Sequence, residues 1–217
     1  EIVIKSDGTI EPETEFINQT GNLYSLTGNL SQKYAIKIQR SNIVFDGAGC
    51  LINGTVTKGY GFVGPGFLLD GVTNVTVKDI EVIGFSGEDI LVQGGSNCSL
   101  LRLKSPVINF MESDFNTVAE TTGYLHFESS NNNSITRNNI IGSLGLSSSN
   151  GNAVSKNNIT GISVIQGSSF NLLFANNFLG SNLFEFGDKA NSWDNGSVGN
   201  YWRDYLTRYP NATEIGS

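Results

Sequence analysis

Apolar and polar residues alternate along this chain in short segments, which turn residues interrupt every few positions. The segments repeat, and the first residue of each repeat can be placed at Asn42, Asn74, Asn97, Asn132, Gly151 and Phe170. These positions are 32, 23, 35, 19 and 19 residues apart, so a period near 20 carries insertions in its early copies. A period of this length is typical of a solenoid, in which each repeat forms one coil.

Three apolar columns recur at fixed offsets from these first positions. The fifth residue before them gives Leu69, Val92, Phe127, Leu146 and Ile165; the third residue after them gives Phe45, Val77, Leu100, Ile135, Val154 and Leu173; the eighth gives Cys50, Val82, Ser105, Ile140, Ile159 and Phe178. Three short alternating segments per repeat predict three strands per coil. Helical repeats are excluded because Asn and Gly at this density are unfavourable inside helices. We therefore expect an all-β fold, a right-handed parallel β-helix with an N-terminal and a C-terminal cap.

Two further columns change from apolar residues to asparagine along the chain. One place after each first position stand Ile43, Val75, Cys98, Asn133, Asn152 and Asn171, and six places after it stand Ala48, Ile80, Leu103, Asn138, Asn157 and Asn176. Both columns share the inward face of the apolar columns. Asparagine side chains in successive coils can donate and accept hydrogen bonds along the stack. We predict that these asparagines are structural.

The repeat predicts one domain over residues 1–217, with a cap at 1–40, coils at 41–187 and an aromatic cap at 188–217. Two insertions, 54–67 and 105–124, are predicted to project from the rod, although the second can instead contain one further coil. The closing aromatic residues have two interpretations. They cover the open end of the last coil, or they stack on sugar rings; these residues are Trp193, Tyr201, Trp202 and Tyr205.

Composition and charge narrow the possible partners. The chain has 217 residues, a net charge of −7 and a pI near 4.7, which argues against nucleic acid because no basic cluster can displace phosphate counterions. No apolar run reaches the length that a membrane helix needs, so we predict no membrane insertion.

The chain opens at Glu1, and we expect that a leader has been removed and that the protein is extracellular. Nine Asn-x-Ser/Thr sequons are candidate glycosylation sites: Asn18, Asn29, Asn53, Asn74, Asn97, Asn132, Asn158, Asn195 and Asn211.

Few residues suggest catalysis or metal binding. Glycoside hydrolysis needs two carboxylates that face each other across a groove, and the register does not place the close acidic pairs in that way: Asp79/Glu81, Glu88/Asp89 and Glu112/Asp114. His126, the single histidine, is predicted to be a surface imidazole. Asp188, Asp194, Asn195 and Asp204 are a weaker calcium possibility, because they lack EF-hand spacing. We predict no enzyme activity, no metal and no cofactor.

The two cysteines are predicted to be buried free thiols. The register places Cys50 and Cys98 two coils apart, at a rise of about 9.6 Å. The Cα atoms of a disulfide are less than about 7 Å apart, so a bond between them is excluded.

Several motifs carry a resemblance to a known family. NNSITRNNI (132–140), SNIVFDGAG (41–49) and SWDNGSVGNYWRDY (192–205) resemble the NosD-like parallel β-helix family of the pectin-lyase-like superfamily, which is abundant among archaeal surface proteins. The similarity covers the whole chain, including EIVIKSDGTIEP at the N-terminus. Gly-Asn-Tyr-Trp at 199–202 is the most specific part. The resemblance implies a β-helix and an extracellular or periplasmic location.

These observations favour a non-enzymatic extracellular protein that assembles into a homo-oligomer or homopolymer, as a cell-surface filament, sheath or coat. An outward stripe of Leu68, Leu91 and Val164, interrupted by His126 and Gly145, is the predicted contact between copies. Phe110, Met111 and Phe115 in the second insertion are further interface candidates. The alternatives are a carbohydrate-binding surface module and, by the family resemblance alone, a periplasmic accessory for metalloenzyme maturation.

Overall fold

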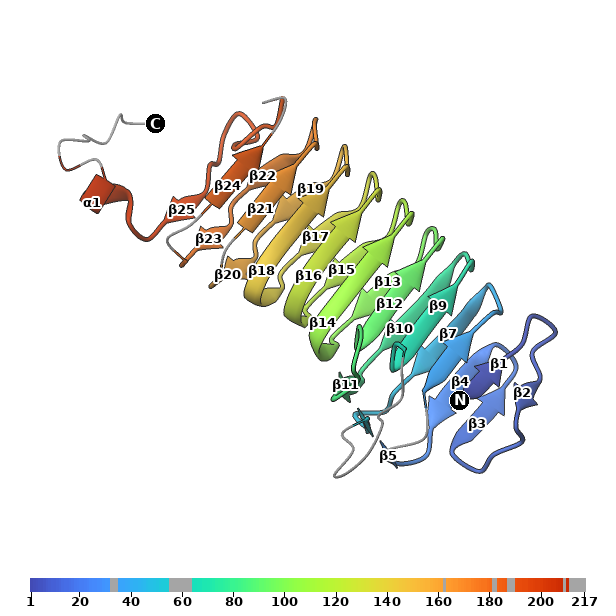
Figure 1. Ribbon diagram of the computed structural model, residues 1–217. Helices are drawn as coiled ribbons and strands as arrows, with labels where there is room; N and C mark the ends of the chain where they lie inside the picture. The colour runs from blue at the N-terminus through green and yellow to red at the C-terminus, as the bar shows by residue number, and fades with distance from the viewer. Residues whose placement is uncertain are drawn as a thin grey trace.

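The computed structural model describes residues 1–31, 35–54, 64–161, 163–180, 183–186, 190–208 and 210. The protein is a rod of stacked coils, a parallel β-solenoid of about seven turns with 49% strand and 2% helix. Figure 1 shows β1 (Ile2–Ile4) and β25 (Tyr201–Trp202) at opposite ends of this rod. The predicted parallel β-helix is confirmed.

One face of the rod is a nine-stranded sheet. Its strands pair in parallel from β4 onward, while β3 lies antiparallel to β4 at the N-terminal end. The strands in spatial order are β3 (Ile17–Thr20), β4 (Leu23–Leu26), β7 (Ile43–Asp46), β10 (Val75–Lys78), β13 (Ser99–Leu101), β15 (Thr117–Ala119), β17 (Ser134–Thr136), β19 (Ala153–Ser155) and β22 (Leu172–Phe174).

The other two faces belong to one 16-stranded sheet. The second face contains β5 (Leu30–Ser31), β8 (Leu51–Asn53), β11 (Glu81–Ile83), β20 (Asn158–Ile159), β23 (Asn177–Phe178) and β25 (Tyr201–Trp202). The third face contains β2 (Ile10–Glu11), β1 (Ile2–Ile4), β6 (Ile36–Ile38), β9 (Phe67–Asp70), β12 (Ile90–Gln93), β21 (Ser163–Gln166) and β24 (Leu183–Phe186). Three long strands run around the corner and join these faces: β14 (Lys104–Met111), β16 (Thr122–Glu128) and β18 (Asn139–Ser147). The single helix of the described part, α1 (Tyr205–Arg208), follows β25.

The inside of the rod is filled by the predicted apolar columns. Aromatic residues stack between coils, as Phe110 and Phe127 do with ring centroids 4.5 Å apart. The positions three residues after each corner are fully buried along the rod, from Phe45 to Leu173. Residues 1–40 contribute β4, β5 and β6 to the stack, and β1 pairs with β6 in parallel. The antiparallel strands β2 and β3 cover the N-terminal edges of two faces.

Two asparagine ladders run along this interior, as the sequence predicts. One contains Asn116, Asn133, Asn152, Asn171 and Asn191, and the other contains Asn138, Asn157, Asn176 and Asn200. From Asn133 onward each rung of the first ladder repeats one geometry: the Oδ1 atom of Asn152, for example, accepts from the backbone N–H and the Nδ2 of Asn133, at 2.8 and 3.1 Å. A third ladder, of buried serines, was not predicted; it contains Ser113, Ser130, Ser149 and Ser168.

The prediction that residues 105–124 project from the rod is wrong, and the alternative of a further coil is confirmed. This segment forms β14, β15 and the start of β16, paired on both sides. The coil begins at Phe115, which has the left-handed backbone (φ 59°) of the other corners. Asparagine or glycine usually occupies that conformation. The phenylalanine, together with a spacing of 18 residues from Asn97, concealed this coil, whereas Phe170 follows Gly151 at the regular spacing of 19. The first insertion falls largely on residues 55–63, outside the described ranges.

The register at Cys50 also differs from the prediction. Val82 pairs with Ile52, because the corner Asp46–Leu51 carries two extra residues. Cys50 is therefore half-buried beside the core instead of within the apolar column. Cys98 is buried, and both thiols are free.

One corner of the rod leaves no room for side chains. A Cβ atom on Gly161 would lie 1.3 Å from the carbonyl oxygen of Gly142, and a Cβ on Gly180 would lie 2.4 Å from that of Gly161. Successive backbones touch here, so only glycine fits.

Candidate functional site

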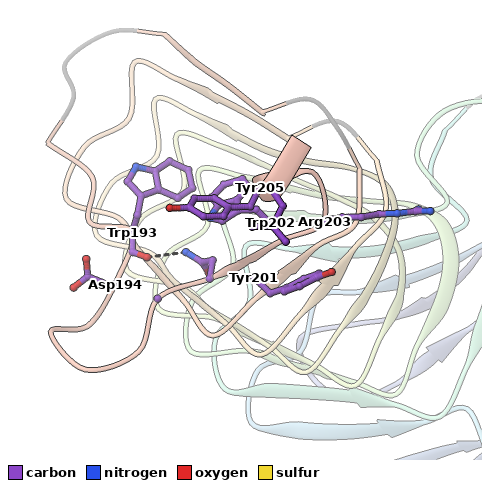
Figure 2. A pocket seen from close by; sticks show the side chains of 9 residues that line it. Trp193, Asp194, Tyr201, Trp202, Arg203 and Tyr205 are labelled. Atoms are coloured by element: carbon purple, nitrogen blue, oxygen red, sulfur yellow. Dashed lines mark hydrogen bonds between the residues drawn. The ribbon is translucent and has the colours of Figure 1, made fainter. Parts of the chain in front are cut away.

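The C-terminal end of the rod carries a hollow of about 540 Å³. Its lining is aromatic with a few polar groups, and consists of Trp193, Asp194, Gly199, Asn200, Tyr201, Trp202, Arg203, Tyr205 and Leu206. Figure 2 shows the rings of Trp193, Trp202 and Tyr205 gathered at the hollow, whereas the Arg203 side chain points away from them. Flat rings beside polar groups are the usual components of a site for a ligand with one apolar face and several hydroxyls.

The asparagine ladder fixes the position of this hollow. Asn200 ends the ladder: its Oδ1 accepts from Asn176 Nδ2 at 2.9 Å. Its own Nδ2 donates to the carbonyl oxygens of Leu173 and Trp193, each at 2.8 Å. The next residues form β25, which pairs in parallel with β23. The structural ladder and the lining of the hollow are thus one continuous hydrogen-bonded unit. Figure 2 draws the bond to the Trp193 carbonyl oxygen as a dashed line.

The two tryptophans cover the core, as one of the two interpretations of the closing aromatics expects. Trp202 stacks on Phe178 with centroids 4.2 Å apart and planes 8° apart. Trp193 lies 5.8 Å from Trp202 at a tilt of 51°. The tyrosines differ, because Tyr201 is 57% exposed and Tyr205 is 47% exposed. The segment therefore both covers the rod and presents aromatic rings to solvent.

The acidic residues of this segment hold turns. Asp194 Oδ1 accepts from the Gly196 N–H at 2.8 Å, and Asn195 Oδ1 accepts from Ser197 and Val198 N–H. Asp188 lies outside the described residues. Within the described ranges no group of three or more His, Cys, Asp or Glu side chains is placed to hold a metal ion.

The predicted outward stripe on the third face is largely covered. Leu91 is only 8% exposed, and Leu68 and His126 are half-buried. Val164 lies in β21, and its side chain is outside the described part. Of the other interface candidates, Phe110 is fully buried in the further coil, Met111 is half-buried and Phe115 is 58% exposed. The exposure on which the predicted contact between copies depended is thus mostly absent from the described residues.

His126 lies across the sheet surface instead of projecting from it. A Cβ on the neighbouring Gly145 would lie 2.5 Å from the imidazole Cδ2, so glycine makes room for the ring. Nε2 lies 3.2 Å from Ser147 Oγ. Burial lowers the pKa of His126, and the nearby carboxylate of Glu128 partly opposes this shift. The ring is therefore a neutral imidazole at pH 7.

Two acidic pairs contribute to structure. Arg102 binds both carboxylate oxygens of Asp79, at 2.6 and 2.9 Å, and holds the pKa of Asp79 below its usual value. Asp89 is 3% exposed, and burial raises its pKa, while the Phe85 N–H donates to its Oδ1. Beside this turn, Asn109 Nδ2 donates to Glu88 at 3.3 Å, and the buried Oδ1 of Asn109 has no partner.

Most sequon asparagines are on the surface. The exposed ones are Asn18, Asn29, Asn74, Asn97, Asn132, Asn158 and Asn195, while Asn53 is half-buried and Asn211 lies outside the described residues. Three of them, Asn74, Asn97 and Asn132, occupy left-handed positions on one corner of the rod. No helix within the described ranges has the length and apolarity that a membrane crossing needs.

Sequence reasoning missed the role of Asn200 and Asn191. Each continues one of the two asparagine columns by one coil, but the longer spacing in the closing segment led to the prediction of a separate cap.

Comparison of the chain with protein-family models, with curated proteins and with solved structures gave no match.

Proposed function

We propose that the protein is an extracellular, non-enzymatic β-solenoid that binds carbohydrate at its C-terminal hollow. The observation that carries this proposal is the exposed ring of Tyr205 next to Trp193 and Trp202, around an open hollow of about 540 Å³. The apolar face of a pyranose stacks on such rings, and its hydroxyls exchange hydrogen bonds with neighbouring polar groups. The Asp194 carboxylate and the Tyr205 hydroxyl supply such groups in the lining, whereas the Asn200 amide is already fully hydrogen-bonded within the ladder.

An open site of this size predicts weak binding. A disaccharide has roughly 20 heavy atoms, and about 0.3 kcal/mol per atom corresponds to a Kd between about 10 µM and 1 mM. The rigid ladder beneath the hollow supports binding, because the site is formed before the ligand arrives and little ordering free energy is lost.

A glycan array tests the proposal. The wild-type chain should bind a restricted set of oligosaccharides, and Tyr205→Ala should lose most of that signal. Phe170→Ser is the matched control, since Phe170 is 75% exposed but lies outside the hollow. An array without selective binding, or equal binding by Tyr205→Ala, refutes the proposal.

Self-assembly is a second candidate, through the end of the rod. Among the described residues β24 is the last strand of the third face, and the edge of a sheet is a template for another strand. Static light scattering tests this candidate: a mass that increases with concentration supports it, and a constant monomer mass contradicts it.

A further inference from the structure

Phe115 stands in an unusual place on the surface. It occupies a left-handed corner with φ 59°, a conformation that costs a bulky side chain about 1–2 kcal/mol, and its ring is 58% exposed. At the same corner most other coils carry residues that adopt this backbone more readily, Asn42, Asn74, Asn97, Asn132 or Gly151, and one other coil carries Phe170. Phe170 repeats this combination, with φ 59° and 75% exposure, so an exposed ring at this corner is compatible with the fold and is available to a partner outside the core.

The neighbour below Phe115 is a sequon asparagine. Asn97 begins the preceding coil, and its N–H donates to the carbonyl oxygen of Asp114, the residue before Phe115. The two corners are therefore stacked at about 4.8 Å, the spacing between paired strands. Asn97 is exposed, and Ser99, the hydroxyl residue of its sequon, is half-exposed on the first face.

The direction of the two side chains follows from the backbone. Asn97 and Phe115 have nearly the same conformation, with φ 53° and 59°. Because the two corners are stacked, their Cα–Cβ bonds leave the rod in the same direction, and the Asn97 and Phe115 side chains lie side by side. The amide of Asn132 takes a different position: its Oδ1 lies 2.6 Å from the place where a Cβ on Gly151 would stand, a space that Phe115 fills with its own Cβ.

We propose that Asn97 carries an N-linked glycan whose first sugar packs on the exposed ring of Phe115. In the transfer, Asn97 Nδ2 attacks C1 of a lipid-linked oligosaccharide. The N–C1 bond forms as the C1–O bond to the lipid phosphate breaks, and the amide loses one proton. The apolar face of the sugar then covers the ring and removes its apolar surface from water.

Asn132 provides a contrast within the molecule. Its side chain leans toward Gly151, which presents no ring, so a glycan at Asn132 has no aromatic platform in the next coil. Phe170 provides the second contrast, because it has the same backbone (φ 59°) and is exposed, but the coil before it begins at Gly151 instead of a sequon. These two positions separate the effect of the Phe115 contact from the effects of a glycan or of an exposed ring alone.

The inference rests on the extracellular location in the proposed function and is independent of the hollow. The full chain is produced through a secretory pathway that glycosylates Asn-x-Ser/Thr, and the Asn97 glycopeptide is sought by mass spectrometry. Ser99→Ala removes the sequon and keeps Asn97. We expect glycosylated wild type to melt about 3 °C above Ser99→Ala, the shift for roughly 1 kcal/mol in a chain of this size.

The platform is tested by repeating this pair of measurements in three backgrounds. The difference in melting temperature between the glycosylated chain and its Ser99→Ala counterpart should vanish in the Phe115→Ser background. The same difference should persist with Phe115→Tyr, which keeps a ring, and with Phe170→Ser. An unmodified Asn97 in the secreted protein overturns the inference, and so does a difference that is unchanged by Phe115→Ser. Loss of sugar binding at the hollow changes neither result, so failure of the proposed function remains distinguishable.

Discussion

Asn157→Ala breaks one rung of a buried asparagine ladder. Asn157 is fully buried; its Oδ1 accepts from the backbone N–H and the Nδ2 of Asn138, at 2.8 and 3.0 Å. Its Nδ2 donates to the Ile135 carbonyl and to Asn176 Oδ1, each at 2.9 Å. Alanine removes all four bonds. The buried backbone N–H of Asn138 loses its acceptor, which costs about 2 kcal/mol of unfolding free energy, and the loss of the bond from the side-chain Nδ2 of Asn138 adds about 1 kcal/mol. The small void that alanine leaves adds about 1 kcal/mol.

The expected loss is therefore about 4 kcal/mol of unfolding free energy, which guanidinium titration followed by circular dichroism can measure. Stacked coils need not unfold in one step, so amide exchange at Asn138 supplies a local readout and should accelerate strongly. Asn158→Ala is the matched control: Asn158 is exposed and accepts one bond, from Asn177, so its loss should stay within about 0.5 kcal/mol. Equal stabilities for the two variants would refute the view that the ladder supports the fold.

Two further substitutions test the corner and the half-buried histidine. Gly161→Ala places a Cβ 1.3 Å from the Gly142 carbonyl oxygen and should cost about 3 kcal/mol of unfolding free energy or more. Gly28→Ala is the control: no atom lies within 4 Å of the added Cβ, so its melting temperature should stay close to that of the wild type. Similar melting temperatures for the two variants would contradict the close contact. His126 has a lowered pKa in the folded state, so the unfolded chain binds a proton first and stability should fall as the pH drops through about 6.5. Urea titrations between pH 7.5 and 5 should show a smaller decrease of the unfolding free energy with falling pH for His126→Gln than for the wild type. The same dependence on pH in both proteins would show that the imidazole is not desolvated.

The repeated columns of the sequence were sufficient to predict the fold. Burial of one side of each short strand requires the same apolar offsets in every coil, and this constraint also revealed that the asparagines of the last coils point inward. The further coil was only an alternative, because Phe115 stands where most other coils have Asn or Gly and follows Asn97 by 18 residues, whereas Phe170 follows Gly151 at the regular spacing of 19. The register at Cys50 failed for a related reason, since extra residues at a corner shift the strand that follows without altering its apolar pattern.

The candidate sites were less predictable. Offsets show whether a side chain points inward or outward, but they do not show what covers an outward side chain, so Leu91 was expected on the surface and is buried. The C-terminal aromatics were recognised as a group. Their arrangement around a hollow depends on Asn200, whose longer spacing from the preceding coil hid its place in the ladder.

Intrinsic tryptophan fluorescence tests the proposed sugar site most directly. The chain has two tryptophans, and both Trp193 and Trp202 line the hollow. All of the tryptophan emission of the protein therefore comes from the proposed site. Titration with an oligosaccharide selected on the array should change the emission saturably, with a Kd between about 10 µM and 1 mM, and Tyr205→Ala should weaken this binding at least tenfold. Selective binding that leaves the emission of both tryptophans unchanged would place the sugar elsewhere and contradict the account.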